Sequence, residues 1–287
     1  MEFSSTSGTA QQALRIPTGA ATLDADLTLP PGASGLVLFA HGSGSSRFST
    51  RNRHVARFLN DGGLATVLAD LLTPGEEAVD ERTRHLRFDI GMLADRLVAV
   101  TDWLGAQERT ADLPIGHFGA STGAGAALVA AASRPDAIRA VVSRGGRPDL
   151  AGDALPRVHA PTLLIVGSRD LPVIAMNQQA LARLGGEKDL VIVPGATHLF
   201  EEAGTLDEVA RLARDWFVRH LADQAASQAV RRAPRAARQD DLADAEPGRQ
   251  YQGTGVMNKA GRFGSSRQPQ DLGGTGGFNR DEGGRHP

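Results

Sequence analysis

Short apolar runs alternate with segments of helical spacing along most of this chain, and this alternation constrains the fold more than any other feature. The apolar runs cover residues 36–40, 65–72, 113–118, 138–143, 162–166 and 190–193. Segments with helical spacing cover residues 53–62, 90–107, 123–133, 177–184 and 206–221. Strands buried on both faces are apolar throughout, and when they alternate with helices they form parallel sheets. We therefore predict an α/β fold with a mostly parallel central sheet and helices on both faces.

The N-terminal part of the chain has a different pattern, which predicts an antiparallel β-hairpin over residues 12–30. Residues 13–16 and 23–29 alternate apolar with polar side chains, and Thr18-Gly19 supplies a turn between them. The hairpin would add antiparallel strands at one edge of the sheet. Residues 1–11 lack a basic start followed by an apolar run, so we expect a short flexible leader that is not a secretory signal.

The pattern of strands and helices stops after Ala222. Residues 223–287 contain almost no Ile, Leu or Val and are rich in Arg, Gln, Asp, Gly and Ser. Such a segment buries too little apolar area to offset the conformational entropy lost on folding. We therefore expect one folded domain over residues 12–222, followed by a disordered low-complexity tail over residues 223–287.

Composition excludes several functional classes. The chain has no cysteine, which rules out a disulfide framework, a cysteine-based zinc site and a thiol nucleophile. Its formal net charge of −2 gives no electrostatic reason to bind nucleic acid. No apolar stretch approaches the roughly 20 residues that span a bilayer. We expect a cytoplasmic protein with no membrane or nucleic-acid partner, and we predict no metal and no cofactor.

The sequence Gly119-Ala120-Ser121-Thr122-Gly123 is the strongest local motif. It matches the pattern G-x-S-x-G, and it lies directly between a predicted strand and a predicted helix. This setting is typical of a nucleophile elbow, a sharp turn that exposes a serine hydroxyl. Both glycines are needed because the turn brings the strand close to the helix. Ser121 is therefore the candidate nucleophile.

A nucleophilic serine needs a general base and an acid that orients the base, and in α/β-hydrolases the acid precedes the histidine in the chain. Asp170 and His198 fit this order, and each follows the carboxyl end of a predicted strand. Sites in open α/β sheets are built at that edge. Asp149, in the loop after the preceding strand, is the alternative acid. His117 lies inside a predicted strand, where we expect a buried core histidine.

The segment from His41 to Arg47 follows the first predicted parallel strand and is rich in Gly and Ser. Acyl transfer needs backbone N–H groups that stabilise the developing oxyanion. We expect one N–H from Thr122, directly after the nucleophile, and the other from Ser43, with Gly44 next to it. His41 would support this loop structurally. The segment contains neither of the glycine-rich patterns that cradle nucleotide phosphates.

Together these motifs resemble the α/β-hydrolase superfamily, and in particular the dienelactone hydrolase-like hydrolases of bacteria. The resemblance extends from about Ala13 to Leu221. It implies an α/β-hydrolase fold with Ser121 as nucleophile, His198 as general base and Asp170 as orienting acid. Typical dienelactone hydrolases use a cysteine nucleophile, which this chain lacks. The family name is therefore a poor guide to the substrate.

The resulting prediction is a metal-independent serine hydrolase of a small carboxylic ester, thioester or lactone, with residues 12–222 as the catalytic domain. An acyltransferase that uses the same triad, or a non-catalytic binding module with this fold, are the alternatives. The sequence does not determine the oligomeric state.

Two further segments bear on specificity. Arg144 and Arg147 follow a predicted strand toward the same edge, and either guanidinium could hold a substrate carboxylate through two hydrogen bonds. Residues 73–89 are rich in charged side chains, and they form either a solvated loop leading into a helix or a flap over the pocket.

Overall fold

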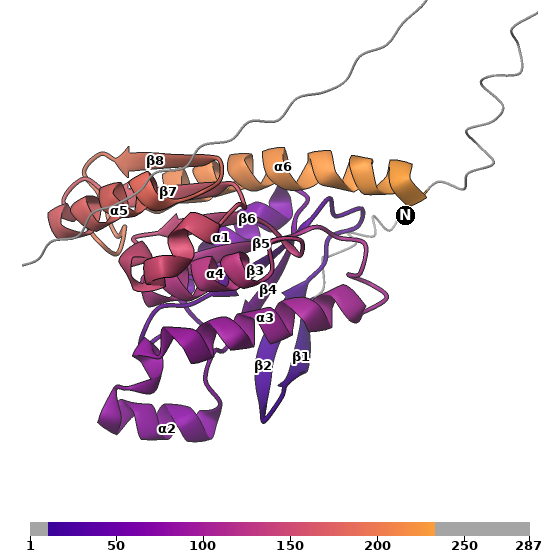
Figure 1. Cartoon of the computed structure of the whole chain (residues 1–287), viewed down its shortest axis with the longest axis horizontal. Helices are drawn as coiled ribbons and strands as arrows, with labels where there is room; N and C mark the ends of the chain where they lie inside the picture. Colours follow the sequence, from indigo (N-terminus) through magenta and orange to yellow (C-terminus); the bar gives the residue numbers. More distant parts are fainter. Residues whose placement is uncertain (1–10, 233–287) are drawn as a thin grey trace, which may run out of the picture. The chain divides into compact units, whose positions relative to one another are not determined.

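The computed structural model describes residues 11–232, which form one sheet of eight strands with helices packed on both faces (Figure 1). The strands are β1 (Gln11–Thr18), β2 (Ala21–Thr28), β3 (Leu36–Ala40), β4 (Ala65–Ala69), β5 (Ile115–Ala120), β6 (Ile138–Arg144), β7 (Thr162–Gly167) and β8 (Lys188–Val193). The helices are α1 (Thr50–Asp61), α2 (Pro74–Thr83), η1 (Leu86–Phe88), α3 (Ile90–Ala106), α4 (Thr122–Ser133), η2 (Pro148–Arg157), α5 (Leu171–Arg183) and α6 (Thr205–Arg232).

The order of the strands across the sheet is β1-β2-β4-β3-β5-β6-β7-β8. Strands β3 to β8 pair in parallel, whereas β1 pairs with β2, and β2 with β4, in antiparallel fashion. The predicted parallel sheet with an N-terminal hairpin at its edge is therefore confirmed. The chain moves from β3 to one side to form β4 and then crosses to the other side to form β5. Ligand sites of open α/β sheets form at such a switch point, beyond the carboxyl ends of the strands.

The sheet separates two hydrophobic cores, because successive side chains of a strand point to opposite faces. Leu36 and Leu38 of β3 pack in the core that also contains side chains of α3, α4 and α5. Val37 and Phe39 pack in the other core, with side chains of α1 and α6. Both faces of the parallel strands are thus covered, which explains why these strands are apolar throughout.

Residues 73–89 fold into α2 and η1, so the expected loop is largely helical. Thr73 caps α2: its hydroxyl accepts the Glu76 N–H at 3.3 Å, and the Glu76 carboxylate accepts the Thr73 N–H at 2.8 Å. This reciprocal pair is a capping box, and Pro74 occupies the first helical position. Helix α2 lies beside the start of α3 in Figure 1.

The last helix, α6, continues to Arg232, beyond the domain end expected at residue 222. Residues 223–232 are rich in Ala, Gln and Arg, which are strong helix formers, so local propensity extends the helix where the apolar pattern has already ended. The rest of the predicted tail, residues 233–287, and residues 1–10 of the predicted leader lie outside the described residues. No helix within residues 11–232, α6 included, has the length and apolarity needed to cross a membrane.

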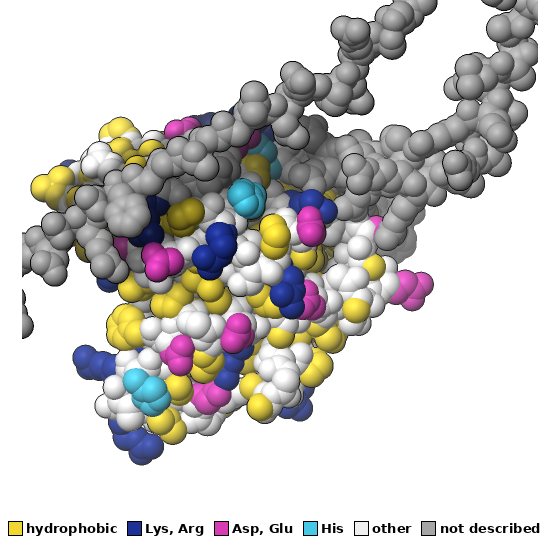
Figure 2. All heavy atoms as spheres, in the orientation of Figure 1, with side chains coloured by type: hydrophobic (Ala, Val, Ile, Leu, Met, Phe, Trp, Pro, Cys, Tyr) yellow, Lys and Arg dark blue, Asp and Glu magenta, His cyan; other side chains and the backbone are white. Residues whose placement is uncertain are grey.

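Charged side chains of both signs are mixed on the face of the domain shown in Figure 2. Surface ion pairs of the domain include Arg134 with Asp102 and Arg211 with Glu208. Exposed pairs of this kind contribute only about 0–1 kcal/mol each to stability. The fold therefore depends mainly on its two apolar cores.

Candidate active site

Ser121 forms the sharp turn between β5 and α4, with φ 50° and ψ −122°. A positive φ is unusual for a residue that carries a side chain, and such strained residues concentrate at functional sites. Backbone hydrogen bonds hold the turn: the Ser121 N–H donates to the Arg144 carbonyl at 3.3 Å, and the Ser121 carbonyl accepts the Arg147 N–H at 3.0 Å. The surrounding strand ends therefore fix the strained conformation of the candidate nucleophile.

Gly119 and Gly123, on either side of Ser121, allow the close approach of β5 to α4 and of α4 to β3. A Cβ atom at Gly119 would lie 2.4 Å from the Ala124 Cα, and a Cβ at Gly123 would lie 2.3 Å from the Ala40 carbonyl oxygen. Backbone atoms cannot move away easily, so only glycine fits at both positions. The strand–turn–helix geometry of a nucleophile elbow is present, as the motif predicts.

His198 and Asp170 are in direct contact. The His198 Nδ1 lies 2.6 Å from the Asp170 Oδ2, and the Asp170 side chain is only 13% exposed. A carboxylate can only accept a hydrogen bond, so the proton of the pair lies on Nδ1. Gly167 permits this approach of the loops after β7 and β8, because its Cβ would lie 2.4 Å from the Ala196 carbonyl oxygen.

The segment Arg144-Gly145, at the end of β6, connects Ser121 to His198. Arg144 accepts the Ser121 N–H through its carbonyl. A Cβ at Gly145 would lie 3.5 Å from both Nδ1 and Cε1 of the His198 ring. Ser121, Asp170 and His198 therefore gather at one edge of the sheet, around the end of β6.

Asp149, the alternative acid, has a different partner. Its Oδ2 accepts hydrogen bonds from Nη2 of Arg147 at 2.7 Å and from Nε of the same side chain at 3.1 Å. This pair also raises the pKa of Arg147, mainly through the hydrogen bonds to the carboxylate. The geometry thus favours Asp170 over Asp149 as the acid that contacts the histidine.

The glycine-rich loop after β3 packs directly against the turn at Ser121. A Cβ at Gly42 would lie 3.0 Å from the Ser121 Cβ. His41 holds this loop, because its Nε2 accepts the Leu71 N–H at 3.0 Å while Nδ1 lies 2.9 Å from the Gly42 carbonyl oxygen. Burial lowers the pKa of His41, which favours the neutral ring that these two bonds require. His41 therefore has the structural role expected from the sequence.

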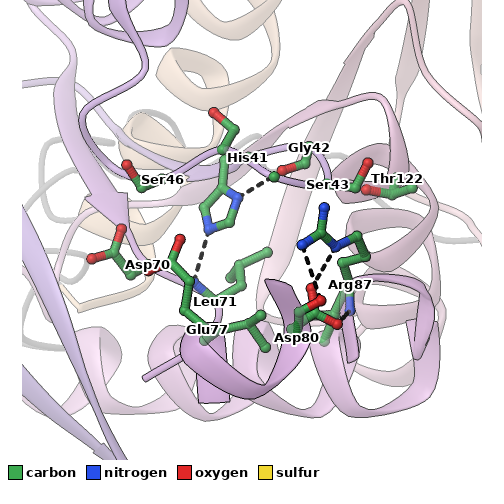
Figure 3. Close-up of a pocket in the computed structure, with 14 residues that line it drawn as sticks. His41, Gly42, Ser43, Ser46, Asp70, Leu71, Glu77, Asp80, Arg87 and Thr122 are labelled. Carbon is green, nitrogen blue, oxygen red and sulfur yellow. Dashed lines mark hydrogen bonds and ion pairs between the residues drawn. The ribbon is translucent and has the colours of Figure 1, made fainter. Parts of the chain in front are cut away.

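A cavity lies between this loop and the segment that contains α2 and η1 (Figure 3). Ser43, Gly44, Thr122 and Arg87 are among the residues that line it. Asp80 anchors Arg87 through an ion pair and accepts the Leu86 N–H at 2.8 Å. The cavity lining is Gly- and Ser-rich near Thr122 and charged toward α2.

Asp80 and Arg87 lie in the segment predicted to be a solvated loop or a flap, and neither is among the predicted site residues. Their position depends on the helical structure of this segment. The capping pattern Thr73-Pro74-Gly75-Glu76 was the available signal for that helix.

The two arginines considered for substrate binding have different surroundings. Arg147 is paired with Asp149, as described above. Arg144 is only 7% exposed, and its Nε and Nη1 are buried without a hydrogen-bond partner among the described residues.

His117 lies in the core, as expected. Its Nε2 lies 2.9 Å from the Thr101 hydroxyl, and burial lowers the pKa of His117 to about 3. The ring is therefore neutral at physiological pH and lies away from the candidate site.

Comparisons with known proteins agree with this geometry. The model of the dienelactone hydrolase family matches residues 23–227. The crystal structure of a dienelactone hydrolase from Anabaena variabilis is 62% identical to this chain, with a TM-score of 0.73, and the match covers 74% of this chain and 98% of that one. Est1E from Butyrivibrio proteoclasticus has the same fold at 19% identity, with a TM-score of 0.62 over 73% of this chain and 99% of its own.

Two curated relatives from Mycobacterium tuberculosis, both named "Putative phosphoribosyl transferase", are 59% identical over 208 residues, or 72% of this chain. That match covers 46% of each relative, so this chain spans about half of their length. The family match, in contrast, extends over most of the described domain. The chain belongs to the dienelactone hydrolase family of α/β-hydrolases.

Proposed function

We propose that this protein is a serine hydrolase that cleaves a small carboxylic ester, thioester or lactone through an acyl-enzyme on Ser121. One observation carries the proposal: a serine with φ 50° lies at a strand–helix turn, and the strand end that holds this turn lies next to a histidine bonded to a partly buried aspartate. The membership in a family of hydrolases supports the same reaction class.

The hydrogen bond between His198 and Asp170 assigns the roles of the two imidazole nitrogens. When the Nδ1–H group donates a hydrogen bond to the carboxylate and keeps its proton, Nε2 carries the lone pair and is the base. Ser121 Oγ attacks the carbonyl carbon of the substrate while its proton passes to Nε2. The protonated imidazole then gives this proton to the leaving oxygen or sulfur, and the acyl group stays on Ser121.

The second half of the reaction repeats these steps with water. His198 accepts a proton from water, the resulting hydroxide attacks the acyl-enzyme, and Ser121 leaves with the proton that His198 returns. Asp170 remains ionised and stabilises the imidazolium in both halves. The products are a carboxylic acid and an alcohol or thiol, or a hydroxy acid from a lactone.

Two backbone N–H groups can stabilise the negative charge on the carbonyl oxygen. Thr122 is the first residue of α4, so its N–H has no acceptor within the helix and lies at the positive end of the helix dipole. Ser43 lines the same cavity as Thr122 (Figure 3). Gly42, the neighbour of Ser43, packs against the turn at Ser121, because a Cβ at Gly42 would lie 3.0 Å from the Ser121 Cβ, and this packing supports Ser43 as the second donor.

An acyltransferase is the second candidate for the same residues, because it shares the acyl-enzyme and differs only in the acceptor. Phosphoribosyl transfer, named for the mycobacterial relatives, is not proposed. The shared segment is 46% of those relatives, and it also matches nearly the whole length of a dienelactone hydrolase. The activity in their name therefore need not belong to this segment.

The test compares the purified protein with Ser121→Ala in two assays: hydrolysis of 4-nitrophenyl acetate and covalent labelling by a fluorophosphonate probe, which loses fluoride when serine attacks phosphorus. We expect both signals to disappear in Ser121→Ala. Ser133→Ala, an exposed serine at the other end of α4, is the matched control and should keep both. Labelling that persists in Ser121→Ala would refute the assignment of the nucleophile.

A further inference from the structure

Two consecutive glycines lie between the candidate base and the candidate nucleophile. Gly145, with φ 49°, and Gly146 directly follow β6. Gly145 lies next to the ring of His198, because a Cβ at Gly145 would lie 3.5 Å from Nδ1 of that ring. The residue after the pair, Arg147, donates its N–H to the Ser121 carbonyl at 3.0 Å. Gly145-Gly146, which we call the glycine link, therefore connects the surroundings of the base to the turn at the nucleophile.

The glycine link has no side chains that could hold it in place. Glycine has more backbone freedom than any other residue, so an ordered pair of glycines needs partners elsewhere in the fold. A side chain does not fit at Gly146, because a Cβ would lie 1.9 Å from the Ser143 Oγ and 2.6 Å from the Ala124 Cβ. The link is therefore held through its backbone, and one such bond is donated by the Gly145 N–H to the Ile165 carbonyl at 2.8 Å.

Asn177 of α5 supplies another backbone contact of the glycine link. Its Nδ2 donates to the Gly146 carbonyl at 3.0 Å and to the Val173 carbonyl, one turn earlier in the helix, at 2.8 Å. Both acceptors are carbonyl oxygens, so the orientation of the amide is fixed, because a flipped amide would turn its own oxygen toward them. The Asn177 side chain is fully buried, so water does not compete for these hydrogen bonds.

Stability alone does not explain a buried amide at position 177. The Asn177 Oδ1 has no hydrogen-bond partner among the described residues. An unpaired acceptor in the core costs free energy, and an apolar side chain would avoid this cost. Residues that break such a rule of protein cores concentrate at functional sites. The cost therefore points to a role for the hydrogen bond that Asn177 does form with the glycine link.

Helix α5, which carries Asn177, also begins at the acid of the candidate triad. Asp170 is the N-cap of α5, and its carbonyl accepts the Ile174 N–H at 3.0 Å in the first turn. Asn177 lies about two turns further along the same helix. The bond from Asn177 to Gly146 therefore ties the helix that begins at Asp170 to the segment between the base and the nucleophile.

We propose that Asn177 is a positioning residue, which holds the glycine link so that Ser121, His198 and Asp170 keep their relative positions. This inference rests on the proposed function. Because Asn177 is fully buried, it acts through the Gly146 carbonyl and not by contact with the substrate. Alignment of the reacting groups is a large part of catalysis, and a misplacement of about 1 Å costs about 100-fold in rate.

The kinetic test is Asn177→Ala, with 4-nitrophenyl acetate as the substrate. We expect kcat to fall by about 10- to 100-fold, whereas KM should change little because the substrate does not contact Asn177. Val173→Ala is the matched control, since it shortens another buried side chain of α5 and leaves the bond to Gly146 in place. It should lower Tm but keep kcat at temperatures well below Tm. An equal loss of kcat in both variants would refute the inference, because the effect would then come from the packing of α5.

A second variant, Asn177→Asp, keeps the inference testable if Asn177→Ala folds poorly. Aspartate has nearly the same shape but donates a hydrogen bond only when its carboxyl group is protonated. Burial raises the pKa of a carboxyl group, so we expect the activity of Asn177→Asp relative to wild type to fall as the pH rises from about 6 to 9. Gln178→Glu makes the same chemical change at an exposed neighbour and should keep a constant ratio. A large deficit that does not depend on pH would contradict the role of the donor.

Amide hydrogen exchange, followed by NMR, tests the inference without relying on catalysis. The exchange rate of the Arg147 N–H reports how firmly the glycine link holds the turn at Ser121. Relative to the amides of β2, on the far side of the sheet, this rate should rise about tenfold in Asn177→Ala, as expected for one lost hydrogen bond. In Val173→Ala the relative rate should stay at its wild-type value.

The exchange measurement also separates this inference from the proposed function. If the protein hydrolyses no ester, faster exchange at Arg147 in Asn177→Ala still supports the role of Asn177 in positioning the turn, and only the hydrolase proposal is refuted. If hydrolysis requires Ser121 but Asn177→Ala keeps the wild-type kcat and the wild-type exchange rate, only the role of Asn177 is refuted.

Discussion

The Nδ1 of His198 lies 2.6 Å from the Oδ2 of Asp170, and this contact joins the loops that follow two adjacent parallel strands, β7 and β8. A carboxylate in this position fixes the imidazole tautomer and stabilises its protonated form. Asp170→Asn should keep the shape of the contact but favour the wrong tautomer. We expect kcat for 4-nitrophenyl acetate to fall by about 10³- to 10⁴-fold, with unchanged circular dichroism.

Asp149→Asn provides the matched comparison for that prediction, because Asp149 was the other acid that the sequence allowed. It removes an exposed ion pair with Arg147 and should change kcat less than tenfold. If Asp149→Asn caused the larger loss, Asp170 would not be the orienting acid.

Gly42 should be intolerant of a side chain for a catalytic reason. A Cβ there would lie 3.0 Å from the Ser121 Cβ and 3.2 Å from the Ala120 carbonyl oxygen. Gly42→Ala should therefore displace the loop that carries Ser43, whose N–H is the proposed second oxyanion donor. Since loss of an oxyanion donor costs roughly 10²- to 10³-fold in kcat, we expect a fall of at least tenfold from its displacement.

Gly75→Ala is the control for Gly42→Ala. Gly75 lies in α2 with open space around its Cα, so a methyl group meets no atom within 4 Å. Alanine also has the higher helix propensity, so Gly75→Ala should retain activity and raise the free energy of unfolding by up to about 1 kcal/mol. Normal kcat in Gly42→Ala would contradict the placement of the oxyanion loop.

Asp80 should be important for the stability of the segment that covers the cavity in Figure 3. It is 1% exposed, and it pairs with Arg87 and accepts the Leu86 N–H. Asp80→Asn would leave the Arg87 guanidinium without its charge partner at the cavity wall. We expect the urea midpoint of unfolding to fall clearly in Asp80→Asn, whereas Glu81→Gln, at an exposed neighbour, should leave it nearly unchanged.

His117 should make the protein less stable in acid. Its pKa is lowered from an ordinary value of 6.5 to about 3 by burial, so between these values the unfolded chain binds a proton that the folded chain does not. The contribution of His117 to the free energy of unfolding is therefore fully present above pH 6.5 and decreases as the pH falls toward 3. Between pH 6.5 and 4.5 the loss should be about 2–3 kcal/mol, since each pH unit corresponds to about 1.4 kcal/mol.

The measurement is urea unfolding of the wild type and His117→Gln at pH 7.5 and 4.5. Glutamine retains a polar group for the Thr101 hydroxyl but does not titrate, so the variant should lose less stability on acidification. His159→Gln, at an exposed histidine, should behave like the wild type. Equal acid sensitivity of His117→Gln and the wild type would show that another group causes it.

The sheet could be predicted from the sequence because each of its central strands is a short run of apolar residues. Leu36, Val37 and Phe39 are apolar because both faces of β3 are buried, and the same is true of the other central strands. The motif around Ser121 was equally local, since its glycines reflect contacts within one turn. Asp170 and His198 could be predicted because each directly follows a predicted strand and the aspartate precedes the histidine in the chain.

Two parts of the site could not be predicted in this way. Helix α2 has no apolar stripe, because charged residues such as Glu77 and Glu81 dominate it, and its capping box was the only local signal. Arg144 and Arg147 differ in whether a carboxylate of the folded domain lies within reach of the guanidinium, and sequence spacing does not determine this. Spacing from the strand makes the two arginines equivalent, whereas burial distinguishes them.

The strand β6 contributes none of the three candidate catalytic side chains, yet it lies between β5, which leads to Ser121, and β7, which leads to Asp170. Strand β6 pairs with β5 on one side and with β7 on the other, so it separates the strand that leads to the nucleophile from the strand that leads to the acid. His198 arrives only after β8, the last strand of the sheet. The three candidate side chains come together only when β5, β6, β7 and β8 have paired, so the return of hydrolysis during refolding should report the formation of this half of the sheet.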